Sequence, residues 1–226
     1  MTEDTNKKIN PYFSPGAHDI KINVFHLGST IVKFDLPTQL IDDINMLYDD
    51  NSKNLEPHND LLAGKIAEEN AVDEILNDDI KTIFLTCFQQ YVNLANFAKS
   101  GKTENPKWIP ILSQAWINEM KAGEYNPTHY HTGIKSEVGL SSVLMLKRPN
   151  SYGVEASREE RPANGWLEFT GGDQSPLGVS QIRTDAQVGE FYVFQYSLLH
   201  GVYPFNGTDE VRRTLSYNCD LIKKGK

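Results

Sequence analysis

The second half of the sequence carries seven short strand-like runs, and this pattern limits the possible fold more than any other feature. The runs span residues 115–120, 128–131, 141–147, 166–169, 190–195, 201–205 and 212–218. Turn residues separate them, and two longer loops interrupt the series at 148–164 and 171–181. Many short strands between glycine- and proline-containing turns are typical of a β-sandwich or barrel. We therefore predict a mainly β core for this half of the chain.

Two helices are predicted ahead of this core. One begins near Pro37, a residue suited to a first helical turn, and carries Leu40, Ile44 and Tyr48 on one face. The stronger signal spans 80–98, where isoleucine, phenylalanine and tyrosine recur at helical spacing. We expect both helices to pack against a sheet.

The remaining N-terminal segments have weaker signals. Residues 62–76 are rich in alanine and glutamate and form a third helical candidate. Residues 20–34 contain β-branched and aromatic residues on both sides of Gly28 and Ser29, which predicts a hairpin. Residues 1–16 are polar and contain prolines, so we expect a loose arm there.

Composition excludes several classes of partner. The net charge of −8 disfavours nucleic acid and anionic membranes, because both would repel the protein. The sequence opens on acidic residues with no apolar stretch behind them, so we expect no signal peptide and a soluble, cytoplasmic protein. The two cysteines, Cys87 and Cys219, are expected to be buried thiols in a reducing compartment.

Three of the six histidines have the arrangement of a metal site. His129 and His131 stand two residues apart in a strand-like run, so their side chains would point to the same face, roughly 7 Å apart. His200 follows a later strand-like run and could complete a facial triad with open positions. We predict that these three residues bind a metal ion, whereas His18, His26 and His58 are expected to be structural.

The last strand-like run contains a candidate anion site. Its alternation places Arg212, Thr214, Ser216 and Asn218 on one face and Arg213 on the other. A guanidinium can form a bidentate pair with a carboxylate, and nearby hydroxyls can donate further hydrogen bonds. A surface ion pair on an edge strand is the alternative. Because the two arginines face opposite ways, only one of them can contribute to the anion site.

The order and spacing of several motifs over residues 108–222 carry a family resemblance. The motifs are Trp116-Ile117-Asn118, Gly123, Asn126, His129-Tyr130-His131, Leu140-Ser141-Ser142-Val143-Leu144-Met145-Leu146, Pro149, Gly189, Val193-Phe194, the run from Leu199-His200-Gly201 to Phe205, Arg212 and Ser216-Tyr217-Asn218. Together they resemble the 2-oxoglutarate/Fe(II)-dependent oxygenases, and in particular the prolyl-4-hydroxylase-like branch with its small bacterial and phage proteins. Residues 1–104 resemble the family only in placing helices ahead of the core.

The resemblance implies a fold and a set of reactants. The length of 226 residues already predicts one domain over 1–226, and the arm, hairpin and supporting helices would occupy 1–104. A double-stranded β-helix (jelly-roll) catalytic core would span 105–222. Fe(II) would be the cofactor, and 2-oxoglutarate (2OG) and O₂ the co-substrates.

The resemblance also implies roles for individual residues. His129 would be the first iron ligand and His200 the distal one. Arg212 would bind the distal carboxylate of 2OG, helped by Thr214 or Ser216. Asn118 and Ser141 are further candidates for co-substrate contact.

The chain departs from the family at the second metal position. The family pattern there is His-x-Asp or His-x-Glu, whereas this sequence has His131. Either iron has three imidazole ligands, or His131 is not a ligand and water or Glu137 takes its place. We favour the three-histidine site, because Fe²⁺ with three neutral ligands and the 2OG dianion is formally neutral.

The implied reaction is hydroxylation of a substrate C–H bond, with succinate and CO₂ as co-products. A prolyl residue in a protein or peptide is the first candidate substrate, ahead of small molecules. Three alternatives stay open: a zinc-dependent hydrolase or lyase with a three-histidine site, a cupin-like oxygenase that needs no 2OG, and a non-catalytic jelly-roll binding module. Arg212 favours the 2OG reaction, because a hydrolytic site has no evident need for such an anchor.

Overall fold

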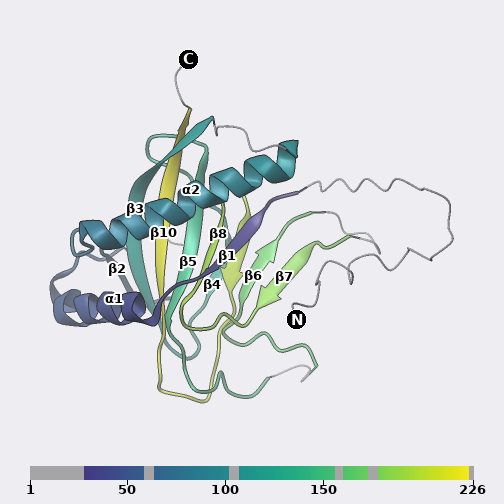
Figure 1. Cartoon of the computed structure of the whole chain (residues 1–226). Helices are drawn as coiled ribbons and strands as arrows, with labels where there is room; N and C mark the ends of the chain where they lie inside the picture. Colours follow the sequence, from purple (N-terminus) through teal and green to yellow (C-terminus); the bar gives the residue numbers. More distant parts are fainter. Residues whose placement is uncertain (1–27, 59–63, 102–106, 156–159, 173–177, 224–226) are drawn as a thin grey trace, which may run out of the picture.

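The computed structural model describes residues 28–58, 64–101, 107–155, 160–172 and 178–223 (Figure 1). These residues are mostly β and form two antiparallel sheets, with strand orders β1-β8-β5-β10-β3-β2 and β4-β9-β6-β7. The strands are β1 (Ile31–Asp35), β2 (Glu68–Ala71), β3 (Trp108–Met120), β4 (Asn126–His129), β5 (Gly139–Lys147), β6 (Leu167–Thr170), β7 (Gln181–Thr184), β8 (Glu190–Gln195), β9 (Leu199–Val202) and β10 (Arg212–Lys223). The predicted mainly β core is confirmed.

Two helices cover one face of the larger sheet. α1 (Thr38–Asn51) is followed by a short 3-10 turn, η2 (Ser52–Asn54), and Figure 1 shows α2 (Asp78–Ser100) running across β3, β10, β5 and β8. The Asn77 side chain caps α2 by accepting a hydrogen bond from the Ile80 N–H, and the helix ends at Gly101 in a left-handed conformation. Both predicted helices are confirmed. Neither of them, nor any other described helix, combines the length and hydropathy needed to cross a membrane.

An apolar core lies between the helices and the larger sheet. Phe84 and Phe88 of α2 contact Phe191 of β8 and Tyr217 of β10 edge to face, with ring centroids 5.2–6.3 Å apart. Such edge contacts add about 0.5–1.5 kcal/mol per pair to the burial of apolar area. The two cysteines are free thiols buried in this same layer, as expected: Cys87 and Cys219.

A second apolar core separates the two sheets. Its residues include Val143 and Met145 of β5, Phe194 of β8, and Leu167 and Phe169 of β6. Side chains alternate along a strand. On β5 and β8, every second residue therefore faces the helices, and the residues between them, which belong to this second core, point toward the smaller sheet. The larger sheet is therefore a middle layer, with helices on one face and the smaller sheet on the other.

Two segments differ in kind from their predictions, and the strands predicted at 128–131 and 201–205 end earlier, at His129 and Val202. The helix predicted at 62–76 is wrong over the described residues, because Glu68–Ala71 is a strand that pairs with β3. Pairing with a long neighbouring strand outweighs the helical propensity of alanine and glutamate. Residues 181–184, placed at the end of a predicted loop or beyond it, form edge strand β7 against β6.

The described residues include only part of the predicted N-terminal hairpin and none of the predicted arm. The second half of the hairpin is strand β1, which pairs with β8 across the register Ile31↔Phe194 to Asp35↔Glu190. Residues 20–27 and the predicted arm at 1–16 lie outside the described residues. Among the described residues, β1 is an edge strand of the larger sheet.

Candidate metal and anion site

The three predicted histidines converge between the sheets. His129 ends β4 and pairs directly with His200 of β9, while His131 lies two residues beyond the strand. Their ring centroids are 4.3 Å apart for His129 and His200, 5.0 Å for His131 and His200, and 5.1 Å for His129 and His131. One ligating nitrogen from each residue lies within 4.8 Å of the other two. The fold thus brings together the residues that the sequence singled out.

Hydrogen bonds fix which nitrogen of two rings can bind a metal. Nδ1 of His129 lies 2.7 Å from the Pro127 carbonyl oxygen, and Nδ1 of His200 lies 2.9 Å from that of Leu198. A carbonyl only accepts, so Nδ1 carries the hydrogen in both rings and Nε2 keeps a free lone pair. Bonds of this kind hold the rings of metal-binding histidines in position.

The spacing of two nitrogens fits a shared ion. Nε2 of His131 lies 3.1 Å from Nε2 of His200. Two imidazole nitrogens bound at about 2.1 Å and at right angles to one ion lie about 3 Å apart. The donor set and its spacing therefore suit a divalent transition metal.

Burial keeps the three imidazoles neutral at physiological pH. It lowers the pKa of His129 and lowers that of His200 well below its usual value. Burial, with added repulsion from His129, lowers the pKa of His131 to about 3. A neutral imidazole offers its lone pair to a cation, whereas a protonated one repels it.

These pKa shifts predict how the stability of the metal-free protein depends on pH. In the unfolded chain each histidine takes up a proton near its usual pKa of about 6.5, whereas in the folded protein it stays neutral. The unfolded state then binds more protons, so the free energy of unfolding falls as the pH drops from about 7 to 5. The expected slope is up to about 1.4 kcal/mol per pH unit for each histidine. Urea unfolding measures it, and His131→Asn should flatten the slope; an unchanged slope in that variant contradicts the assignment.

Arg212 and Arg213 point to opposite faces of β10. Arg213 faces the helices, with Nη2 2.7 Å from the Glu119 carboxylate and 2.6 Å from that of Asp49. Arg212 is buried, and its Nε donates a 3.0 Å hydrogen bond to the Gly165 carbonyl. Its Nη2 is buried without a hydrogen-bond partner among the described residues. Arg212 is therefore the arginine with donor capacity left for a ligand.

A narrow cavity beside the histidines contains part of the predicted co-substrate site. Its lining residues are Trp116, Asn118, Asn126, His129, His131, Val143, Leu167, His200, Val202, Thr214 and Ser216. Three of the predicted co-substrate residues are among them, namely Asn118, Thr214 and Ser216. The volume of about 20 Å³ holds about one water molecule, which is less than a dicarboxylate occupies.

Two other predicted residues lie outside that lining. Arg212 is buried one alternation along β10 from Thr214. Ser141 is buried on β5, and its Oγ has no hydrogen-bond partner among the described residues. Sequence reasoning gave no site role to Trp116 or Asn126, although Trp116 shares a face of β3 with Asn118 and could have been inferred from that alternation.

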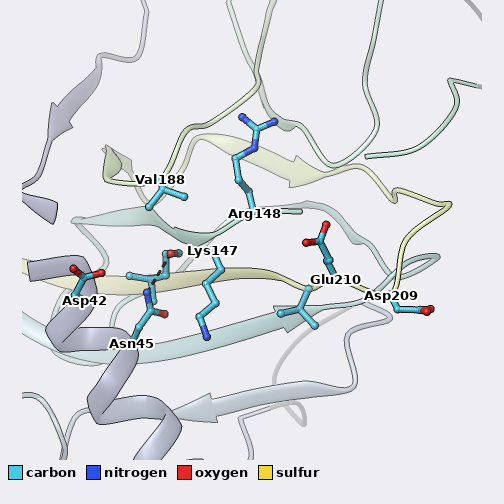
Figure 2. Close-up of a pocket in the computed structure, with 9 residues that line it drawn as sticks. Asp42, Asn45, Lys147, Arg148, Val188, Asp209 and Glu210 are labelled. Carbon is cyan, nitrogen blue, oxygen red and sulfur yellow. Dashed lines mark hydrogen bonds between the residues drawn. The ribbon is translucent and has the colours of Figure 1, made fainter. Parts of the chain in front are cut away.

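A larger opening lies elsewhere and holds none of the predicted residues. It has a volume of about 650 Å³ and is lined by residues of α1, of the end of β5 and of the loop before β10. Figure 2 shows Asp42 and Asn45 on one side of it and Glu210 on the other, with the Arg148 side chain pointing away from α1. Several of its polar groups are already bonded: Asn45 to the Leu146 carbonyl, and Glu210 to Asn150. The volume of an opening alone therefore does not select the candidate site in this structure.

Comparison with protein families identifies the segment that carries the site. Residues 114–218 match the model of a family described as "Putative 2OG-Fe(II) oxygenase". The matched segment includes His129, His131, His200 and Arg212. No curated protein matches the sequence.

Several solved structures share the fold. A prolyl-4-hydroxylase from Pseudomonas putida matches with 16% identity over 86% of this chain and 93% of its own, at a TM-score of 0.51. A Trichoplax adhaerens prolyl hydroxylase, solved with a hypoxia-inducible-factor peptide, matches with 10% identity over 84% and 82% of the two chains, at 0.52. The α-ketoglutarate-dependent carbocyclase SnoK from nogalamycin biosynthesis matches with 12% identity over 87% and 82%, at 0.53. At these identities the likeness is one of fold.

Proposed function

We propose that residues 114–218, which match a 2OG-Fe(II) oxygenase family model, form an oxygenase domain that hydroxylates a C–H bond of its substrate and converts 2OG and O₂ to succinate and CO₂. One observation carries the proposal: Arg212, buried and with a free Nη2, lies on the strand that lines the three-histidine cavity. A buried guanidinium nitrogen without a hydrogen-bond partner is costly, and a carboxylate would satisfy it. We further propose that the two sheets form the double-stranded β-helix of this family.

The three imidazoles would hold Fe(II), which supplies the oxygen-activating chemistry when bound. His129 and His200 present Nε2, because their Nδ1 hydrogens are donated to backbone carbonyls. All three ligands are neutral, so they leave the full charge of the ion to attract an anion. The 2OG dianion balances that charge, which supports the three-histidine site over one that recruits Glu137.

The residues of β10 and its neighbours would bind 2OG. Arg212 would pair with the distal carboxylate, and the hydroxyls of Thr214 and Ser216 lie along the same face of the strand. Asn118 is opposite Thr214 in the β3–β10 register, and its buried Oδ1 has no hydrogen-bond partner among the described residues. Asn118 and Ser141 are therefore the next candidates for contact with the co-substrate.

A prolyl residue in a peptide or protein is the first substrate to test. The prolyl hydroxylases among the fold neighbours support this choice. One of those neighbours is described as a carbocyclase, so a similar fold also supports other reactions. Small molecules are therefore the substrates to test after the peptides.

The decisive experiment measures 2OG binding and succinate formation by the full chain. Iron-loaded protein is incubated with 2OG, O₂ and a proline-containing peptide, and succinate and oxidised peptide are quantified. We expect succinate to form and 2OG to bind in an iron-dependent way. Folded, iron-loaded protein that neither binds 2OG nor forms succinate contradicts the proposal. Retention of zinc with no affinity for 2OG would favour the zinc hydrolase or lyase instead.

A further inference from the structure

His131 is the one histidine of the group that no strand holds. β4 ends at His129, and residues 130–138 continue as an irregular loop before β5. The backbone N–H of His131 donates a 2.9 Å hydrogen bond to the carbonyl of Tyr196. Its ring packs against Tyr196 and Trp116, with centroids 6.4 and 5.7 Å away. The position of this imidazole therefore depends on what holds the loop and Tyr196.

A single buried carboxylate ties both together. Asp220, on β10, is 1% exposed. Its Oδ1 accepts a 3.1 Å hydrogen bond from the Tyr196 hydroxyl, and its Oδ2 accepts a 2.9 Å bond from the backbone N–H of Lys135. The carboxylate thus joins the larger sheet to Tyr196 and to the loop.

Backbone bonds complete this connection. Tyr196 N–H donates to the Gly139 carbonyl at 3.0 Å, and Leu221 N–H donates to the Val138 carbonyl at 2.9 Å. The loop is therefore fastened at His131, at Lys135 and again at its return to β5. Tyr196 is held at its backbone and at its hydroxyl.

Two glycines show how closely the loop lies on this pair. A Cβ at Gly133 would clash with the Asp220 carboxylate, and a Cβ at Gly139 would clash with the Tyr196 ring. Neither glycine has a positive φ, so close packing is the reason that a side chain does not fit. The loop therefore packs directly against both partners.

Burying a carboxylate is costly, so Asp220 needs the hydrogen bonds that it accepts. Burial, reinforced by Asp220, raises the pKa of Tyr196 well above its usual value. The hydroxyl consequently stays protonated and remains a donor.

We propose that Asp220 and Tyr196 are positioning residues that hold His131 in the three-histidine group and so determine how tightly the metal is bound. The inference rests on the proposed function, since it assigns a role to His131 as a ligand. Neither residue belongs to that ligand group. Their effect on the metal is exerted through the loop.

The test compares two tyrosine-to-phenylalanine variants of the full chain. Tyr196→Phe removes the hydroxyl that bonds Asp220. Tyr203→Phe is the matched control, because it removes a hydroxyl that donates a 2.7 Å bond to the Glu168 carboxylate, away from the 130–138 loop. Cobalt(II) is titrated into each metal-free protein, its visible absorption is recorded, and the melting temperature is measured.

We expect Tyr196→Phe to weaken cobalt binding about 10-fold and to alter the absorption bands, as the loss of a residue that supports a metal ligand does. Tyr203→Phe should change neither, although both variants lose some thermal stability. Asp220→Asn should weaken cobalt binding in the same direction, because an amide oxygen accepts more weakly than a carboxylate.

Two outcomes would overturn the inference, and they are distinguishable. Wild-type affinity and spectrum in Tyr196→Phe, with 2OG binding intact in the wild type, would leave the proposed function standing and reduce the pair to a stabilising contact. Wild-type protein that binds neither cobalt nor 2OG would remove both proposals.

Discussion

His200→Ala is expected to abolish succinate formation and to lower the affinity for Fe(II) by more than about 100-fold, because the loss of a residue that merely supports a ligand already costs about 10–100-fold. His200 is the most buried of the three histidines, at 4% exposed. Its Nε2 faces His131, and its ring is close to that of His129. Removing it leaves two imidazoles and a cavity where the third donor was.

Metal content after dialysis and iron titration under anaerobic conditions measure this effect. His58→Ala is the control, since the His58 ring stacks on Trp116 at 4.9 Å and lies outside the three-histidine group. The control should keep its metal. A His200→Ala protein that retains one iron per chain and forms succinate at the wild-type rate would show that the metal is bound elsewhere.

Arg212→Ala is expected to weaken 2OG binding by about 2–5 kcal/mol, or about 30-fold or more. The substitution removes the buried guanidinium that would pair with the distal carboxylate and leaves that carboxylate without its partner. Metal affinity should be largely retained, because no histidine changes. Calorimetric titration of 2OG into the iron-loaded or cobalt-loaded protein measures the loss.

The neighbouring arginine provides a matched control. Arg213→Ala removes the same side chain from the same strand, but on the opposite face, where it pairs with Glu119 and Asp49. This variant should lose about 3 kcal/mol of folding free energy, because Glu119 is left unpaired in a partly buried position. Its folded fraction should still bind 2OG as the wild type does. A larger loss of 2OG affinity in Arg213→Ala than in Arg212→Ala would show that the co-substrate lies on the helix side of the sheet.

Local sequence patterns predicted the helices and strands in which apolar and polar residues recur at a regular spacing. The helical spacing of Phe84 and Phe88 places both in the core beside Phe191, and α2 forms as expected. On β10 the period of two separates Arg212 from Arg213, and the structure has them on opposite faces. These features depend on neighbours in the chain, which is why the sequence alone reveals them.

Features that depend on distant partners were not predictable in the same way. Strand β2 contains Glu68, Glu69 and Asn70, which have low strand propensity, and it is a strand because β3 supplies the pairing. The position of His131 is a second example. Its spacing from His129 suggested a shared strand, whereas the structure holds it in a loop through Tyr196 and Asp220.

The proposed reactants would be held by different layers of the sandwich. His129 and His200 belong to the smaller sheet and Arg212 to the larger one, with Phe194 and Phe169 packed between the sheets. The apolar residues between the sheets would therefore set the distance between the bound ion and the guanidinium. A dicarboxylic acid one carbon shorter or longer than 2OG should then bind more weakly, so the thickness of the protein's interior would select its co-substrate by length.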